Sequence, residues 1–207
     1  KRVQIDGAFR VANGSAAAPA YAWTCDTDLG FYRVGANNMS LAYGCAAKVN
    51  FQDGRIHVND TANASMNRGI TINQLCQDDE SFALKSSDVS HAWTGSGGME
   101  ADTYMSIGKI NSACGGVRLK AVTKGDSYGF HVQAVMDAAC ACATHGTGGH
   151  AIICMKASKE VSCVEAALNS NGNAFSVGNF NVTQFIVDAE GDLFANAGTT
   201  TDAVTVY

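Results

Sequence analysis

Thiol and imidazole side chains gather in one short stretch of this sequence. The candidate ligands there are Cys140, Cys142, His145, His150 and Cys154. Thiolates and imidazoles are the ligands that zinc prefers. However, a zinc knuckle usually has two residues between the ligands of each pair. Cys-x-Cys in an extended strand instead places both thiols on one face, without a second pair to meet them. We therefore interpret this stretch as a cysteine-rich strand end followed by a loop, and we expect no metal and no other cofactor.

Alternating carboxylates are the second candidate for chemistry. They occur at Asp26-x-Asp28-x-Gly30 and again at Asp188, Glu190 and Asp192. Such a turn can present oxygen atoms to calcium. The first stretch lacks the third ligand, the central glycine and the distal glutamate of an EF-hand loop. We favour the alternative, in which these carboxylates accept hydrogen bonds from backbone amides in Asx-turns.

A third candidate is hydrolysis by the adjacent acids Asp78, Asp79 and Glu80. A glycosidase needs two carboxylates on opposite sides of a cleft. Neighbouring residues of a strand point to opposite faces, so this run is typical of a solvated turn. The Gly-x-Ser-x-Gly elbow of a serine hydrolase is missing from the sequence. We expect no catalytic residue and no enzyme activity.

Aromatic side chains and asparagines offer surface chemistry instead. Phe31 and Tyr32 are consecutive, so one of them faces outward in a strand, and Trp23 and Trp93 lie near turns. Exposed aromatics can stack on sugars or pack in subunit interfaces. The glycosylation triplet Asn-x-Ser/Thr starts at Asn13, Asn38, Asn59, Asn63 and Asn181. These sites matter only if the protein passes through a glycosylating secretory route.

The candidate residues described above are expected to lie on strands or in the turns between them. Apolar side chains alternate with polar ones at Val3/Ile5, Ile56/Val58, Ile70/Ile72, Val117/Leu119/Ala121 and Phe130/Val132/Ala134. Period-two alternation places one side of a strand in a core and the other in water. Turn signals separate the runs at Asn13-Gly14, Asp53-Gly54, Lys124-Gly125-Asp126, Asn171-Gly172 and Glu190-Gly191-Asp192. We predict an all-β fold of many short antiparallel strands, sandwich-like or elongated, that forms oligomers.

The less regular segments set the expected boundaries. Residues 158–168 fit either a helix or a strand, and we favour a strand because the neighbouring segments are strands. The glycine-rich residues 91–103 and the residues 140–150 are expected to be loops. The first of these loops divides an N-terminal β region, residues 1–94, from a C-terminal β region, residues 95–207, which could be continuous with the first.

The composition limits the classes of partner that this chain is expected to bind. Among the 207 residues, 46% are apolar and 16% are charged, with a net charge of −5. The 14 basic residues form no cluster, so we expect no nucleic-acid binding. No apolar run reaches the ~20 residues of a membrane helix, so we expect no membrane partner. The eight cysteines are compatible with free thiols and with disulfides.

Three segments resemble tail fibre and tail-associated proteins of tailed phages and their metagenomic relatives. They are residues 16–44, 68–94 and 181–196, about half of the chain. The residues that match in the first segment are Pro19, Asp26, Asp28, Gly30, Tyr32, Arg33, Gly35, Ala36 and Asn37. The resemblance implies a virion structural protein, often trimeric and sometimes involved in host recognition, without catalytic residues. The cysteine content departs from this family.

We therefore expect a structural subunit of a virion tail fibre or similar extracellular fibre. It would assemble through strand edges with copies of itself, as a homotrimer or a filament. The candidate strands for pairing with a neighbour are residues 1–11 and 202–207. An alternative is a tail-fibre module that binds a carbohydrate receptor, such as a cell-surface glycan. A polysaccharide depolymerase is the least favoured alternative.

Overall fold

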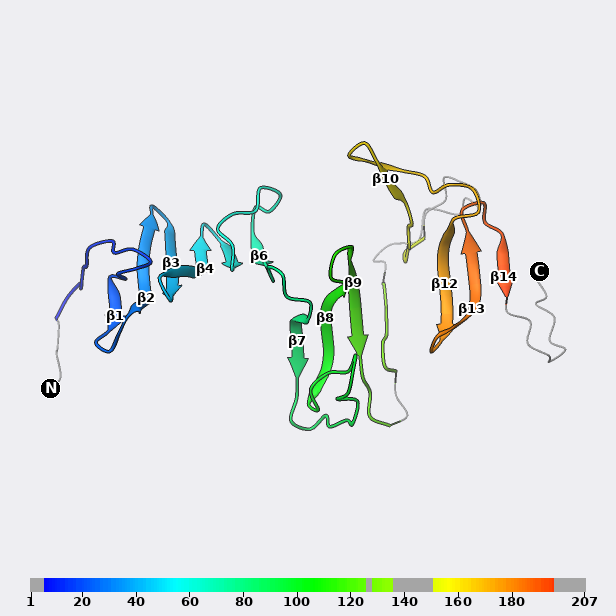
Figure 1. The fold of residues 1–207 in the computed structure, drawn as a ribbon, viewed down its shortest axis with the longest axis horizontal. Helices are drawn as coiled ribbons and strands as arrows, with labels where there is room; N and C mark the ends of the chain where they lie inside the picture. Colours follow the sequence, from blue (N-terminus) through cyan, green and yellow to red (C-terminus); the bar gives the residue numbers. More distant parts are fainter. Residues whose placement is uncertain (1–5, 126–127, 136–150, 196–207) are drawn as a thin grey trace. The chain divides into compact units, whose positions relative to one another are not determined.

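A computed structural model of the chain describes residues 6–125, 128–135 and 151–195 (Figure 1). In this part of the chain the regular structure consists of strands, and no helix is long and apolar enough to span a membrane. The predicted all-β fold class is confirmed. The strands are β1 (Tyr21–Trp23), β2 (Asp26–Gly35), β3 (Asn38–Tyr43), β4 (Ala46–Gln52), β5 (Arg55–Val58), β6 (Gly69–Ile72), β7 (Glu80–Lys85), β8 (Thr103–Asn111), β9 (Gly115–Ala121), β10 (Lys159–Val161), β11 (Val164–Ala166), β12 (Asn173–Asn179), β13 (Val182–Asp188) and β14 (Leu193–Ala195).

The chain divides into two compact units, residues 1–131 and residues 132–207. The first contains a six-stranded and a three-stranded sheet, and the second contains a hairpin and another three-stranded sheet. The expected boundary between residues 94 and 95 lies inside the connection from β7 to β8, which pair with each other. The loop at 91–103 is present as predicted, but the backbone hydrogen bonds on either side of it join its two ends into one sheet.

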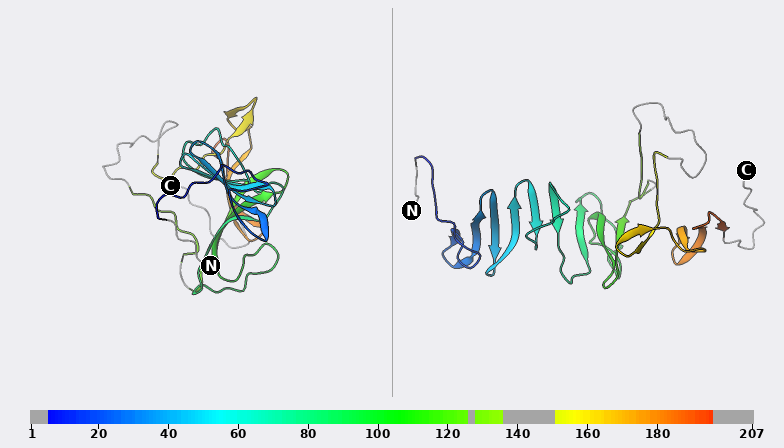
Figure 2. Two further views of the ribbon diagram at one scale, coloured as in Figure 1. Left: turned by 90° about the vertical axis from the view of Figure 1, so that its left-hand side faces the viewer. Right: turned by 90° about the horizontal axis from the view of Figure 1, so that it is seen from above.

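The six-stranded sheet has the order β1-β2-β3-β4-β5-β6, and its strands run side by side (Figure 2). Neighbours are antiparallel from β1 to β5, whereas β6 is parallel to β5. The predicted Asp53-Gly54 turn joins β4 to β5, with φ of 47° and 78° at its two residues. Positive φ at both central positions suits the right-handed twist of a hairpin.

The second sheet, β7-β8-β9, is an antiparallel meander. The long connection from Ser86 to Asp102 folds back on this sheet. Its Met99 is buried, and the hydroxyl of Ser106 on β8 donates to the Met99 sulfur at 3.1 Å. This contact between the connection and the sheet is therefore a sulfur–hydroxyl hydrogen bond, and a large apolar core is not formed among the described residues.

In the second unit, β10 and β11 form a short hairpin, and β12-β13-β14 form an antiparallel sheet. The preference for a strand over a helix at residues 158–168 is confirmed, although a turn at Ser162 and Cys163 divides it into two strands. Asn171 has a φ of 58°, in keeping with the predicted turn at Asn171-Gly172.

Two expectations are wrong. Phe130, Val132 and Ala134 alternate in the sequence, yet residues 128–135 form no strand, because no strand within the described residues pairs with them. Asp26 and Asp28 belong to β2, and the turn before that strand is made by Thr24 and Cys25 instead. Other expectations lie outside the described residues: the strand at Val3 and Ile5, the loop at 140–150 and the strand at 202–207.

Candidate functional site

The six-stranded sheet carries its apolar side chains on one face, where they lie in register across the strands. The first row is Tyr21, Phe31, Leu41, Val49, Val58 and Ile72. The second row is Arg33, Met39, Phe51, Ile56 and Ile70. Six of these apolar residues are from 38% to 61% exposed: Tyr21, Phe31, Met39, Phe51, Ile70 and Ile72. We call this surface the apolar face.

The opposite face of the same sheet carries a row of polar residues that is largely buried. Tyr32, Ser40, Asn50, His57 and Thr71 lie side by side across β2 to β6. Three of them, Ser40, Asn50 and His57, are at most 2% exposed. The Asn50 side-chain amide donates to the oxygens of Asn38 at 2.7 Å and Ser40 at 2.9 Å.

The crossover between β5 and β6 contacts this polar row at its β6 end. The Asn63 side-chain amide donates to the Thr71 hydroxyl at 3.1 Å, and that hydroxyl lies 3.6 Å from the Met66 sulfur. Both ring nitrogens of His57 are buried without a hydrogen-bond partner in the described part of the chain. The sheet thus buries its polar side and leaves its apolar side accessible, the reverse of the usual arrangement in a soluble monomer.

The two three-stranded sheets also carry exposed rows of apolar side chains. In β7-β8-β9 the cross-strand apolar rows are Phe82, Ile107, Leu119 and Leu84, Met105, Ala121. In β12-β13-β14 they are Phe175, Val187, Leu193 and Val177, Phe185, Ala195. The large side chains on the outer strands of these rows are 36% to 50% exposed: Phe82, Leu84, Leu119, Phe175, Val177 and Leu193. Among the described residues, the buried hydrophobic ones are Ala42 and Met99 alone.

The size of the apolar face can be estimated. With about 200 Å² for a fully exposed large apolar side chain, the six exposed residues of the apolar face present roughly 550 Å². The largest apolar patch of an ordinary monomer is about 300–600 Å², and a stable interface buries about 800 Å² on each partner. The half-buried neighbours in the two rows add to the patch. This one face therefore lies at the upper end of the range for monomers and has about two thirds of the area that a stable interface buries on one partner.

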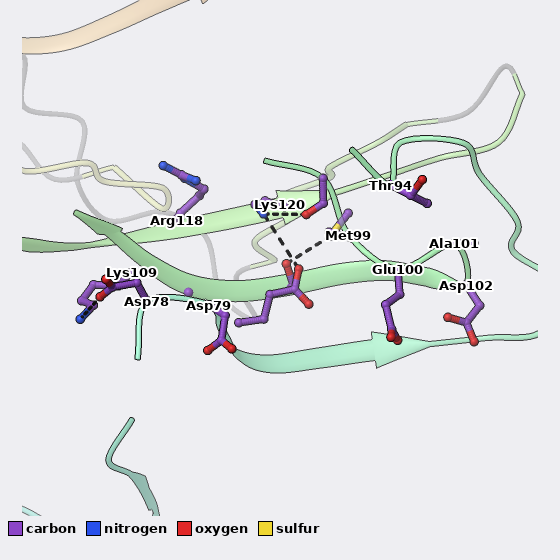
Figure 3. Close-up of a pocket in the computed structure, with 14 residues that line it drawn as sticks. Asp78, Asp79, Thr94, Met99, Glu100, Ala101, Asp102, Lys109, Arg118 and Lys120 are labelled. Carbon is purple, nitrogen blue, oxygen red and sulfur yellow. Dashed lines mark hydrogen bonds and ion pairs between the residues drawn. The ribbon is translucent and has the colours of Figure 1, made fainter. Parts of the chain in front are cut away.

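A groove of about 890 Å³ is the second candidate site (Figure 3). It lies on the β7-β8-β9 sheet beside the connection that contains Gly98 and Met99. Its charged lining consists of Asp78, Asp79, Glu80, Glu100, Asp102, Lys109, Arg118 and Lys120. The volume is in the range of ordinary ligand sites.

Ion pairs organise the groove. Lys109 Nζ lies 2.6 Å from Asp78 Oδ1, and Lys120 Nζ lies 3.9 Å from Glu80 Oε1. Lys120 also donates to the Gly98 carbonyl at 3.1 Å, and its ammonium lies 5.8 Å from the centre of the Trp93 ring. Glu80 Oε1 is buried and accepts no hydrogen bond within the described residues.

At the other end of the groove, Lys85 forms ion pairs with Glu100 and with Asp102, the latter at 3.1 Å. The hydrogen bond to Glu100, followed by the one to Asp102, raises the pKa of Lys85 above its ordinary value. These two carboxylates are therefore held by a cation. The groove as a whole offers paired donors and acceptors, which suits a ligand with many hydroxyl groups.

The acids Asp78, Asp79 and Glu80 had been assigned to a solvated turn. The structure places Asp78 and Asp79 just before β7 and Glu80 at its first position, with all three at the groove. The basic partners were not identified from the sequence, since they come from β8 and β9. The signal that could have found two of them is the alternation of Arg118 and Lys120 on one face of β9.

The acidic pair Asp26 and Asp28 contacts a cysteine. The Cys45 thiol donates to Asp28 Oδ2 at 3.3 Å, which lowers the pKa of Asp28 and raises that of Cys45. A hydrogen bond with Asp28 raises the pKa of Asp26. Among the described residues, no group of three or more His, Cys, Asp or Glu side chains is arranged to hold a metal ion.

The other acidic turn agrees with the Asx-turn interpretation. Asp188 is buried, and its Oδ1 accepts from the backbone amides of Glu190 at 3.1 Å and Asp192 at 2.8 Å. Glu190 Oε2 accepts from the Asn171 amide at 2.8 Å. The carboxylates of this turn therefore satisfy backbone donors, as predicted.

One of the five candidate zinc ligands lies within the described residues. Cys154 is exposed, whereas Cys140, Cys142, His145 and His150 lie outside the described residues.

Two asparagines of the glycosylation triplets take part in side-chain hydrogen bonds. The side-chain oxygen of Asn13 accepts from the Arg33 guanidinium at 3.3 Å, and the side-chain oxygen of Asn38 accepts from Asn50.

The consecutive aromatics separate as the alternation requires. Phe31 lies in a row of the apolar face, and Tyr32 lies in the polar row behind it.

Comparison of the chain with protein-family models, with curated proteins and with solved structures found no match. The function therefore has to be inferred from these surfaces.

Proposed function

We propose that this chain is a structural subunit of an extracellular fibre, such as a virion tail fibre, and that it assembles with copies of itself. The observation that carries the proposal is the apolar face of the six-stranded sheet, which lies opposite a buried polar row. Burial of apolar area contributes about 25 cal/mol per Å², so a partner with the same surface would be strongly favoured.

Another copy of the chain is the partner that best fits this surface. The rows of the apolar face run through all six strands, and the two three-stranded sheets carry similar apolar rows. A repeated, non-directional surface suits packing against an identical surface in a closed or helical assembly. Pairing through the free edges of β1 and β6 is a second contact that such an assembly could use.

The test is light scattering during size-exclusion chromatography over a range of protein concentrations, with electron microscopy of the same sample. Wild-type protein is expected to form oligomers or fibres. Ile70→Lys places a charge on the apolar face and is expected to give smaller species. Val135→Lys is the matched control, because Val135 is also an exposed valine but lies outside the strands. A wild-type protein that stays monomeric at every concentration would contradict the proposal.

Binding of a glycan in the groove is a second candidate function. The specific support is Lys120 at the groove, whose ammonium lies 3.9 Å from Glu80 Oε1 and 5.8 Å from the centre of the half-exposed Trp93 ring. A glycan array with wild-type protein, Lys120→Ala and the distant exposed control Lys124→Ala tests it. Binding that is lost in the first variant and kept in the second supports a glycan site. No binding to any glycan, or equal binding by all three proteins, contradicts it.

A further inference from the structure

The cysteines of this chain do not behave as small core residues. The six in the described part are Cys25, Cys45, Cys76, Cys114, Cys154 and Cys163, and all of them are exposed and lie outside the strands. Free cysteine is among the residue types most often buried in folded proteins. Exposure of the whole set therefore requires another explanation than packing.

Three of them lie at one end of the six-stranded sheet. Cys25 is in the β1–β2 turn and Cys45 is in the β3–β4 turn. Because β1 to β5 alternate in direction and β6 runs parallel to β5, the chain also leaves β6 at this end, four residues before Cys76. We call this end of the sheet the cysteine end.

The opposite end of the sheet has ordinary turn residues. Its β2–β3 turn contains Ala36 and Asn37, and its β4–β5 turn contains Asp53 and Gly54. At the cysteine end, Cys45 has a φ of 61°, a left-handed conformation that Gly, Asn and Asp adopt at lower cost. The chain uses Asn37 and Asp53 for positive φ at the other end. The thiols are thus placed where a conventional residue would make a more stable turn.

Cys25 and Cys45 are too far apart to pair with each other within one copy. The β1–β2 and β3–β4 turns are separated by two inter-strand spacings, about 10 Å. A disulfide requires Cα atoms roughly 4.4–6.8 Å apart. A cysteine of another copy can approach an exposed turn without this restriction.

We propose that the cysteine end, formed by Cys25, Cys45 and Cys76, forms disulfides with another copy of the chain. The inference rests on the proposed self-assembly, which would hold the copies together before the bonds form. In each reaction two thiols, one from each copy, lose two protons and two electrons as one S–S bond forms. The electrons pass to dissolved oxygen, giving hydrogen peroxide, or to a low-molecular-weight disulfide, which is released as two thiols. The disulfides then cross-link an assembly that first forms by apolar packing.

Asp28 slows the reaction of one of these thiols. It accepts a hydrogen bond from the Cys45 thiol, which raises the pKa of Cys45. The thiolate is the form that attacks a disulfide, so Cys45 reacts more slowly than it would without Asp28.

The experiment compares wild-type protein, the variant Cys25→Ser/Cys45→Asn/Cys76→Ser and the control Cys114→Ser/Cys154→Ser/Cys163→Ser. Both variants lose three thiols, and asparagine at 45 tolerates the positive φ. Each protein is exposed to air or to oxidised glutathione, then examined by non-reducing electrophoresis and by mass spectrometry of its cross-linked peptides. Light scattering with and without dithiothreitol measures its assembly.

We expect covalent dimers or larger species in wild type and control, and at least a tenfold loss of these species in the cysteine-end variant. Equal cross-linking in both variants would overturn the inference, as would a disulfide between Cys25 and Cys45 of the same copy. Oligomers that persist in dithiothreitol without any covalent species would overturn the disulfides but leave the proposed function intact. Monomers under both conditions would overturn the proposed function, and the inference with it.

Discussion

Replacement of Ile70 by alanine measures how much the apolar face contributes to assembly. Ile70 lies on the edge strand β6 and is 60% exposed, so its truncation changes little inside the chain. The substitution removes three carbons, worth about 2.4 kcal/mol if they are fully buried, at about 0.8 kcal/mol each. Because 60% of the residue is still available for burial, assembly is expected to lose about 1.5 kcal/mol per copy. That is about a tenfold change in the dissociation constant for each copy.

Sedimentation velocity over a hundredfold range of concentration is the suitable assay, since it follows the midpoint of assembly directly. Val135→Ala, at an exposed position outside the strands, is the matched control and is expected to leave the midpoint unchanged. Thermal unfolding of the dissociated chain checks that Ile70→Ala has not altered the fold. An unchanged midpoint in Ile70→Ala, or an equal shift in Val135→Ala, would refute the claim that this face drives assembly.

Three further predictions concern single residues in and beside the six-stranded sheet. Hydrogen bonds from the next two backbone amides lower the pKa of Asp60. Its contribution to stability is therefore present above the unfolded pKa, near 3.9, and is lost as the pH falls through the lower folded value. Urea unfolding from pH 2 to 6 is expected to show less acid destabilisation in Asp60→Asn than in wild type. Asp28→Asn is expected to lower the pKa of Cys45 toward its ordinary value and to speed its reaction with an aromatic disulfide at pH 7, followed by absorbance; an unchanged rate would argue against the thiol–carboxylate contact. Gly30→Ala would place a methyl group against the backbone oxygen of Tyr21 and is expected to destabilise the β1–β2 pair by about 1–3 kcal/mol in chemical unfolding, whereas Gly35→Ala, which has open space, is the control.

Local patterns in the sequence were sufficient for the strands and for some turns. The alternation at Ile56/Val58 and Ile70/Ile72 corresponds to β5 and β6, and Asp188 closes an Asx-turn as expected. Each of these features depends on residues within a few positions of one another. Pleating sets which side chains share a face, and a short polar side chain reaches only nearby amides.

The same kind of pattern failed where a distant partner decides the outcome. Residues 128–135 alternate without forming a strand, and Asp26 and Asp28 became part of β2. A strand exists only when another segment satisfies its backbone donors and acceptors, and the alternation of one segment does not identify that segment. The groove was missed for a similar reason, since Lys109, Arg118 and Lys120 lie far along the chain from Asp78.

Alternation along the chain was sufficient to predict strands with one apolar and one polar side. Which of the two sides is buried depends on tertiary contacts: the connection between β5 and β6 contacts the polar row, and the apolar face stays open. Alternation is symmetric with respect to the two faces of a sheet. The path of a connecting segment, fixed by contacts such as the one from Asn63 to Thr71, breaks that symmetry.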